Sequence, residues 1–271
     1  MNFESTADQQ RIREAIATLC ADFGDDYWLA CDLEHRFPGE FHEALAVGGW
    51  LGIAMPESYG GSGLGIAEAA VMMQAISQSG AGFSGASAVH MNIFGLNPVV
   101  VFGSDEQKRR MLPPLIEGRE RACFAVTEPD TGLNTTRIKT RAEKRNGHYV
   151  VSGQKVWIST AQVADKMLLL ARTTPIEQCA RPEHGLSLFY TDLDHNKVEV
   201  REIAKMGRHA VDSNQVFFDA VPVPERELAG FPGAIATSDT ALIDTHDPVV
   251  DLAGEIIRQH RQWQVIALDV S

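Results

Sequence analysis

The sequence predicts an α+β fold: an N-terminal all-helical domain is followed by an antiparallel β-barrel or sandwich domain. Apolar residues recur with a helical period over roughly the first 115 residues. From about Arg121 the period changes to two, as expected for half-buried strands. With 271 residues, the chain is long enough for two domains of ordinary size. We predict domains at residues 1–118 and 119–228, followed by a short tail at 229–271.

The helical segment carries clear start and stop signals. Residues 6–9 (TADQ) and 104–107 (SDEQ) both fit a capping box and are followed by apolar residues at helical spacing. Pro113 and Pro114 predict the end of the second of these helices. The glycines of residues 60–65 predict a flexible turn. We therefore expect several helices joined by short loops.

The strongest short-range signal in the second domain is Asn146 followed by Gly147. Both central residues of a type I′ turn need a positive φ, which this pair adopts readily. We predict a hairpin that pairs residues 137–144 with residues 148–153. Short β-rich runs continue to about residue 221 without a long helix between them, which is typical of an antiparallel barrel or sandwich.

The composition excludes several classes of function. Asp and Glu number 36 against 24 Lys and Arg, which argues against a nucleic-acid partner. The four cysteines form no CxxC pair and the nine histidines no HxxxH pattern, so we expect no metal site. Reduced thiols indicate a cytoplasmic location. No apolar run reaches about 18 residues, and we expect no membrane association.

Residues 80–85 (GAGFSG) match the dinucleotide fingerprint GxGxxG in letters alone. That motif binds a pyrophosphate only when a strand precedes the glycines and a helix follows them. Here a helical pattern precedes the glycines. A junction of small residues between two helices is therefore the preferred interpretation.

Residues 123–132 (CFAVTEPDTG) and 153–159 (GQKVWIS) each read as a strand that runs into a polar loop. A flavin needs a flat apolar face and hydrogen-bonding partners along its edge. Thr127 and Ser159 can supply hydroxyls, and Trp157 can supply an aromatic face. Composition alone favours a plainer interpretation, in which Trp157 is a core aromatic and Thr127 a turn hydroxyl.

These two segments, with residues 205–207 (KMG), 217–224 (FFDAVPVP) and 56–61 (PESYGG), resemble the acyl-CoA dehydrogenase family. With residues 205–207 and 217–224 counted as one motif, the four motifs occur in the family's order over residues 1 to about 230. The resemblance implies a helical domain, a β-domain and a second helical domain, with FAD bound against the β-domain. The flavin contacts it implies are Phe124, Val126, Thr127, Gly132, Leu133, Trp157, Ile158 and Ser159.

The resemblance also implies a reaction, the α,β-dehydrogenation of an acyl-CoA thioester in fatty acid metabolism. A carboxylate removes the α-proton while the β-hydrogen leaves as hydride to flavin N5. An electron-transfer flavoprotein is the implied acceptor, and the family is usually homo-oligomeric. The family's carboxylate base usually lies in the second helical domain, so no catalytic residue is named in this sequence.

Two departures from the family matter. Many relatives carry Gly-Ser-Asp where this chain has Gly132, Leu133 and Asn134, so a hydroxyl near the thioester is missing. Residues 231–271 do not resemble the family's continuation, although Asp247 with Pro248 predicts one helix there. We therefore expect a truncated enzyme or, alternatively, a non-catalytic remnant of the family. Glu255 in this tail stands at an unmatched position and is expected to be a solvated helix charge.

Overall fold

The computed structural model describes residues 5–229, apart from the side chains of Phe94 and Phe102. The predictions for the tail, including its helix and Glu255, lie outside the described residues. The helical part contains α1 (Ala7–Ala21), α2 (Asp25–Leu33), α3 (Gly39–Val47), η1 (Trp50–Gly52), η2 (Glu57–Tyr59), α4 (Ile66–Gln78), α5 (Gly82–His90), the π-helix η3 (Met91–Gly95), α6 (Asn97–Phe102) and α7 (Asp105–Ile116).

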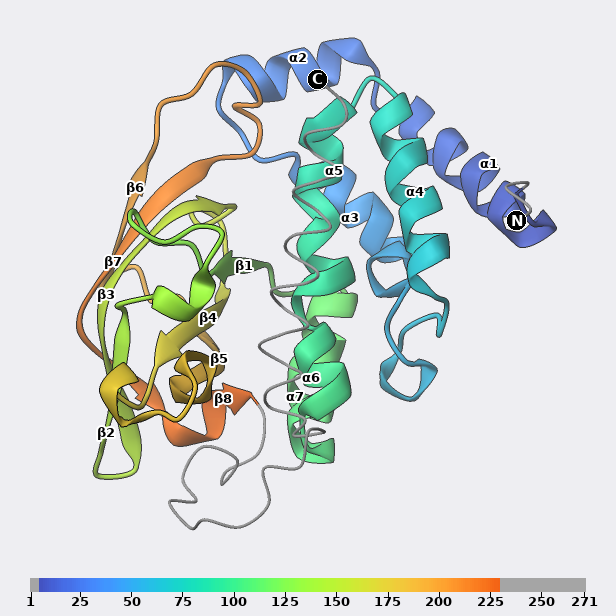
Figure 1. The fold of residues 1–271 in the computed structure, drawn as a ribbon. Helices are drawn as coiled ribbons and strands as arrows, with labels where there is room; N and C mark the ends of the chain where they lie inside the picture. The colour runs from blue at the N-terminus through green and yellow to red at the C-terminus, as the bar shows by residue number, and fades with distance from the viewer. Residues whose placement is uncertain (1–4, 230–271) are drawn as a thin grey trace.

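The second part contains the strands and four short 3₁₀ helices. They are β1 (Ala122–Ala125), η4 (Thr135–Arg137), β2 (Arg141–Arg145), β3 (His148–Ser159), β4 (Lys166–Arg172), η5 (Ile176–Gln178), η6 (Pro182–Gly185), β5 (Leu186–Asp192), β6 (Val198–Glu202), β7 (Ser213–Pro224), η7 (Glu225–Glu227) and β8 (Leu228–Ala229). Helices therefore come first and strands second, which confirms the predicted α+β class (Figure 1).

The predicted capping boxes start α1 and α7. The Gln9 N–H donates to the Thr6 hydroxyl at 3.2 Å, and the Gln107 N–H donates to the Ser104 hydroxyl at 3.2 Å. Each interaction satisfies one of the N–H groups that a helix start leaves without a partner. Of the GxGxxG-like residues, 80 and 81 lie between α4 and α5 and 82–85 form the start of α5, so the segment is a helix junction as preferred.

Pro113 and Pro114 lie inside α7, so the prediction that they end this helix is wrong. A proline lacks its own N–H, but its carbonyl still accepts, and the Glu117 N–H donates to the Pro113 carbonyl at 2.9 Å. Leu112 and Leu115 beside the prolines are fully buried between the helices and the sheet. We attribute the continuation of the helix to this burial, which offsets the lost hydrogen bonds.

The strands form one eight-stranded sheet with the order β6-β7-β3-β2-β4-β5-β8, and β1 pairs with β4 off this path. Most pairs are antiparallel, as predicted, but β1–β4 and β2–β4 are parallel. The end strands β6 and β8 do not pair with each other in the described part of the chain. A closed barrel, one of the predicted alternatives, is therefore wrong, and the sheet is open and mixed.

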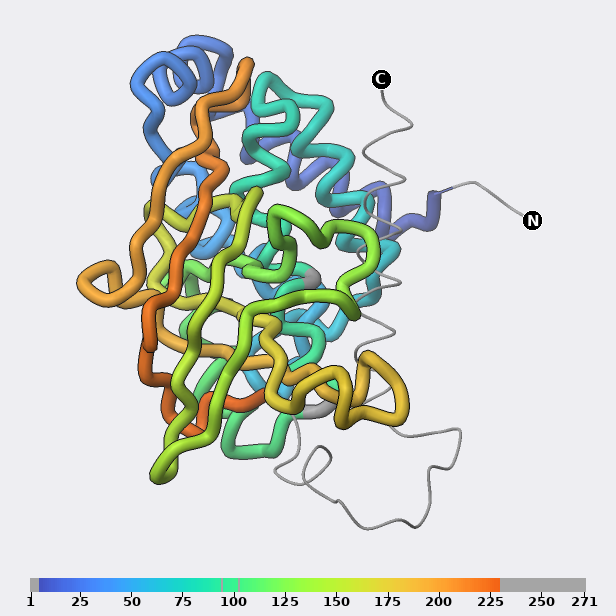
Figure 2. Tube along the Cα trace, turned by 60° about the vertical axis from the view of Figure 1, so that its left-hand side comes forward, coloured from blue at the N-terminus to red at the C-terminus, as the bar shows by residue number. Residues whose placement is uncertain are grey.

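The open sheet nevertheless encloses a core, because it folds over itself (Figure 2). Alternate residues of β4 and β5 point to opposite sides. Leu168 and Leu188 pack in the contact with the helices. Leu169 and Phe189 instead pack with residues of β3 and β7, among them Val151. The β-domain is thus sandwich-like in its packing, and the other face of β4 and β5 packs against the helical domain.

Asn146 and Gly147 form the predicted two-residue turn between β2 and β3, with φ values of 47° and 80°. Val151 pairs within this hairpin, as expected. Ile138 does not, because it is buried in the contact between the helices and the sheet. The predicted first strand was therefore too long, since residues 137–140 precede β2.

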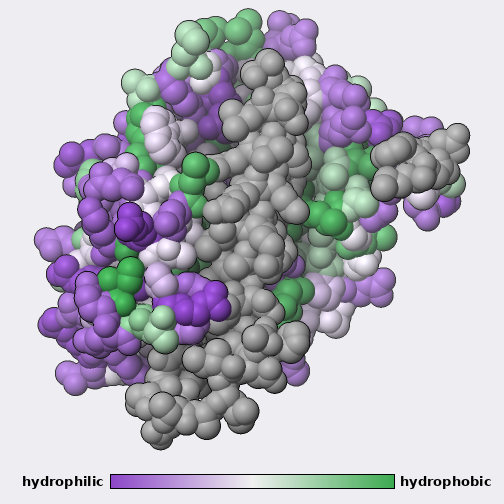
Figure 3. All heavy atoms as spheres, viewed as in Figure 1, coloured by the Kyte–Doolittle hydropathy of each residue, from purple (hydrophilic) through white to green (hydrophobic). Residues whose placement is uncertain are grey.

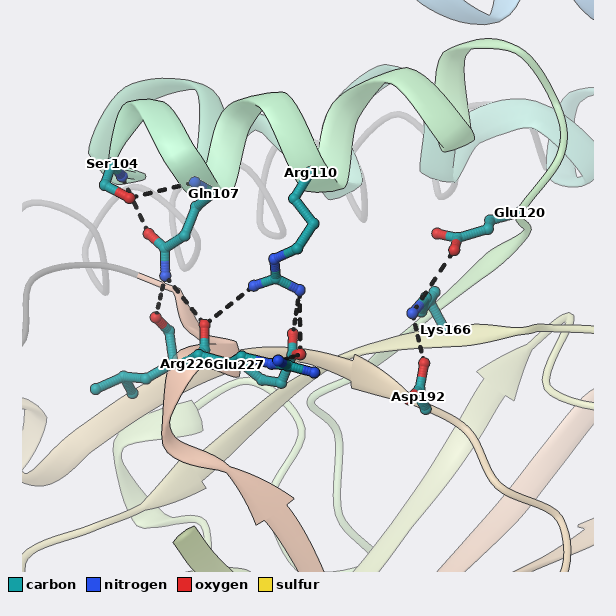
Figure 4. A network of polar contacts seen from close by, with 9 residues as sticks. Ser104, Gln107, Arg110, Glu120, Lys166, Asp192, Arg226 and Glu227 are labelled. Atoms are coloured by element: carbon teal, nitrogen blue, oxygen red, sulfur yellow. Dashed lines mark hydrogen bonds and ion pairs between the residues drawn. The ribbon is translucent and has the colours of Figure 1, made fainter. Parts of the chain in front are cut away.

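Polar contacts join α7 to the end of the β-domain (Figure 4). The Gln107 side chain donates to the Leu228 carbonyl at 2.6 Å. The Arg110 guanidinium contacts both carboxylate oxygens of Glu227, at 2.9 and 3.0 Å, and donates to the Arg226 carbonyl at 3.1 Å. Together with the apolar contact, these bonds fix the helical domain against β8.

Hydrophilic side chains predominate over the β-domain on the face shown in Figure 3. Within residues 5–229, the larger apolar residues gather mainly in three buried clusters, one in each domain and one between them. No helix in this range is both long and apolar enough to cross a membrane.

Candidate functional site

The two sequence motifs meet where β1 ends beside β3. β1 leads into Thr127, and β3 carries the second motif. The Val156 N–H donates to the Thr127 carbonyl at 2.9 Å. Trp157 is the next residue along β3. The structure therefore brings Thr127 and Trp157 close together, although they are separated by a hairpin and a loop in the sequence.

Trp157 is not a core aromatic, because 61% of its surface is exposed. Its φ of 62° lies in the left-handed region, which bulky residues rarely adopt. The pairing of β3 with β7 shifts between Lys155 and Ile158, which marks a β-bulge at this point. The plainer interpretation of Trp157 is thus wrong, and the bulge presents an exposed aromatic side chain at the surface.

A buried ion pair that the sequence analysis did not anticipate lies behind this surface. The Lys155 Nζ is 2.9 Å from Glu128 Oε1 and donates to the Val126 carbonyl at 3.0 Å. The side chains of Lys155 and Glu128 are 0% and 5% exposed. Each partner belongs to one of the two motifs, so the pair joins them. The signal in the sequence was a lysine directly before the apolar residues 156–158.

Burial and pairing have opposite effects on the pKa of each member of this pair. Burial lowers the pKa of Lys155 to about 8, against the opposing effect of Glu128. Burial alone would raise the pKa of the Glu128 carboxyl, but the Lys155 ammonium and nearby hydrogen-bond donors lower it. The pairing therefore favours the anionic form of Glu128, and its carboxylate oxygens already have hydrogen-bond partners.

The same carboxylate anchors the loop that carries Gly132 and Leu133. Glu128 accepts the N–H groups of Lys139, at 2.6 Å, and Thr140, at 2.9 Å. Leu133 is 68% exposed, and no atom lies within 4 Å of the position where a side chain of Gly132 would begin. The loop is therefore held at its base and open at its tip.

The remaining predicted contacts have different surroundings. Val126 and Ile158 are buried, and Phe124 is partly buried against the contact between the helices and the sheet. Their side chains belong to the cores, so these residues can offer a ligand mainly backbone groups. Ser159 is half-buried and pairs with Ser213 of β7.

A surface pocket of about 640 Å³ adjoins the base of this loop. Its basic residues include Arg137 and Arg172. The Arg172 guanidinium donates to the Thr136 and Pro182 carbonyls at 2.6 and 3.1 Å, and no ion pair to it occurs in residues 5–229. Carbonyls satisfy its donors without cancelling its charge, so Arg172 contributes positive charge to a lining that also contains the carboxylates of Asp130, Glu143 and Glu177.

These features fit a flavin better than a metal ion. An exposed indole, a neighbouring threonine and an open glycine loop match a planar ring with a polar edge. Within the described residues, no three His, Cys, Asp or Glu side chains are grouped so as to hold a metal.

Comparison with known families identifies the class of protein. Residues 6–119 match the N-terminal domain of acyl-CoA dehydrogenases, and residues 123–221 match their middle domain. These ranges cover the helical part and most of the β-domain. The chain therefore belongs to the acyl-CoA dehydrogenase family.

Individual relatives agree with this assignment. An acyl-CoA dehydrogenase of Bacillus subtilis is 31% identical over 199 residues, covering 73% of this chain and 51% of the relative. The structure of a glutaryl-coenzyme A dehydrogenase glutaryl-CoA complex is 26% identical with a TM-score of 0.77, covering 86% of this chain and 59% of the other.

A chain in the structure of the electron transferring flavoprotein of Acidaminococcus fermentans is also similar. It is 27% identical with a TM-score of 0.75, and the match covers 85% of this chain and 60% of the other. This chain spans about half the length of the Bacillus relative.

Proposed function

We propose that this chain binds FAD where β1 ends beside β3 and supplies the flavin-facing surface of an acyl-CoA dehydrogenase. The observation that carries the proposal is the exposed Trp157, set next to Thr127 by the bond between Val156 and the Thr127 carbonyl. Family membership supports the same choice of cofactor. The proposed contacts are Phe124, Val126, Thr127, Gly132, Leu133, Trp157, Ile158 and Ser159.

Each residue type has a distinct task in this proposal. FAD, when bound, supplies the acceptor for a hydride that leaves the β-carbon of an acyl-CoA thioester. The Trp157 indole would orient the ring by contact with its face. The hydroxyls of Thr127 and Ser159 and backbone N–H groups would stabilise the negative charge that develops on the ring edge. Because these groups are fixed before the reaction, they need little reorganisation.

The proposed substrate is an acyl-CoA thioester, whose phosphates carry negative charge. The pocket at the base of the loop that holds Gly132 and Leu133 presents the basic side chains of Arg137 and Arg172, within a lining that also includes carboxylates such as Glu177. The glutaryl-CoA complex of a similar protein supports this class of substrate. Leu133 provides an apolar side chain, so selection near the thioester cannot use a side-chain hydroxyl at this position.

An electron-transfer flavoprotein is the proposed acceptor, supported by the similarity to a chain in the structure of an electron transferring flavoprotein. We also propose assembly into a homo-oligomer, as is usual in the family, and a reducing cytoplasmic compartment. The cysteines at positions 20, 31, 123 and 179 are all free thiols, which supports the last point.

Trp157→Ala and Thr127→Ala are expected to weaken FAD binding by about 1–3 kcal/mol in total, since they remove a stacked face and a hydrogen bond. The affinity is measured by quenching of FAD fluorescence during titration with protein. Trp50→Ala, a change in the helical domain, is the control for loss of a tryptophan. Unchanged affinity in both site variants would show that the flavin lies elsewhere.

The dehydrogenation itself is tested by adding a panel of acyl-CoA thioesters anaerobically to the FAD-loaded chain. Bleaching of the flavin absorbance would show that the chain supplies a base of its own. Glu128, the carboxylate next to Thr127, is held by Lys155 and two backbone N–H groups and cannot serve as the base. Bleaching would contradict the non-catalytic alternative, and its loss in Glu255→Gln would assign the base to that residue.

A further inference from the structure

We propose that the Glu128–Lys155 pair is a positioning device that holds the Thr127 loop and the Trp157 bulge in the geometry needed for flavin binding. This inference rests on the function proposed above. The Lys155 side chain is fully buried and that of Glu128 is only 5% exposed, and each is already engaged by the other, so neither is assigned a direct contact with a cofactor. Any effect on the cofactor must therefore pass through the residues that the pair holds.

The first of these residues is Thr127. Lys155 Nζ donates to the Val126 carbonyl and pairs with Glu128, so it contacts the residues on both sides of Thr127. The Thr127 carbonyl itself accepts the Val156 N–H, one residue beyond Lys155. Three consecutive residues of the first motif are thus bonded to two consecutive residues of the second.

The second element held is the loop between residues 128 and 140. Its first residue, Glu128, accepts the N–H groups of Lys139 and Thr140 at the far end of the loop. The Thr140 hydroxyl donates to the Gln154 carbonyl at 3.3 Å, directly before Lys155. The loop is therefore closed at its base around one carboxylate, while a side chain at Gly132 would meet no atom within 4 Å.

The third element is the bulge at Trp157. A left-handed backbone at a bulky residue persists only where the surroundings determine it. On one side of the bulge Lys155 is fixed by the ion pair. On the other side the Asn214 side chain donates to the Ile158 carbonyl at 2.8 Å. Release of the Lys155 anchor would allow the strand to relax toward regular pairing and turn the indole away.

The pair could instead serve stability alone, and the experiment separates the two roles. The double variant Glu128→Gln/Lys155→Met removes both charges at similar volume, so that neither partner is left as an unpaired buried ion. The control is Lys144→Met/Glu225→Gln, which removes an exposed lysine–carboxylate pair from the same domain. Both are compared with the unaltered chain by FAD titration and by hydrogen exchange of peptides from residues 127–140.

We expect the double variant to unfold cooperatively while its dissociation constant for FAD rises at least about tenfold. Amide exchange in residues 127–140 should accelerate, with no change in the helices. The control should resemble the unaltered chain in both measurements. Unchanged FAD affinity and unchanged exchange in a folded double variant would overturn the proposal and leave the pair a purely structural role.

Two outcomes need a separate measurement: the double variant fails to fold, or the unaltered chain binds no FAD. If the double variant fails to fold, Glu128→Asp is measured instead. This change keeps the charge but shortens the side chain by one methylene, so the carboxylate cannot reach Lys155 and both N–H groups together. If the unaltered chain binds no FAD, the proposed function fails for this chain. Hydrogen exchange then decides the inference alone, and slow exchange retained in the variant refutes it.

Discussion

Lys155→Met is expected to lower the free energy of unfolding by about 3–5 kcal/mol, because it leaves the Glu128 carboxylate buried without its partner. The Glu128 side chain is only 5% exposed, so water cannot replace the lost ammonium. The two N–H donors that remain, from Lys139 and Thr140, satisfy hydrogen bonds but bring no positive charge.

A double-mutant cycle checks the origin of this loss. Adding Glu128→Gln to Lys155→Met should recover most of the stability, since the buried charge is then gone. The measurement is urea unfolding of both single variants and the double variant. Additive losses would show that the two side chains do not interact across the contact, contrary to the 2.9 Å separation.

The order of domains and the local starts of helices could be predicted from the sequence because each depends on short-range chemistry. The change of period near Arg121 and the two capping boxes depend on residues a few positions apart. The turn at Asn146 and Gly147 follows from their tolerance of positive φ. The openness of the sheet could not be predicted, because it depends on which distant strands pair.

The candidate site could likewise be predicted from the sequence only in part. The two motifs were visible as strand-to-loop segments, and the structure brings Thr127 and Trp157 together. Their role toward FAD remains a prediction. The exposure of Trp157 depends on a bulge set by pairing with β7, which no local pattern reveals. The Glu128–Lys155 pair joins residues 27 positions apart, so its members could be seen singly but not as a pair.

The structure of the loop at residues 60–65 differs from what its glycine content predicts. It was predicted as a flexible turn, yet successive N–H groups tie it to the preceding segment. Ser62 donates to the Gly52 carbonyl at 2.9 Å, and Gly63 to the Met55 carbonyl at 2.8 Å. Gly60 and Gly61 look equivalent in the sequence, but only Gly60 has a positive φ, of 92°.

Gly61→Ala is nevertheless expected to be the more damaging change, lowering the free energy of unfolding by about 3 kcal/mol. A methyl group on Gly61 would lie 2.5 Å from the carbonyl carbon of Met55 and closer still to its oxygen. Met55 is 1% exposed and belongs to the apolar contact between the helices and the sheet, so its backbone cannot move without disturbing that core.

Gly60→Ala is the matched control in the same loop. No atom lies within 4 Å of a methyl group at Gly60, so its cost is only that of a left-handed alanine, about 1 kcal/mol. Thermal unfolding of the two variants gives the comparison. A larger loss for Gly60→Ala would mean that backbone conformation, rather than the close approach to Met55, selects glycine in this loop. The expected order therefore tests whether the loop is packed against Met55 as the structure shows.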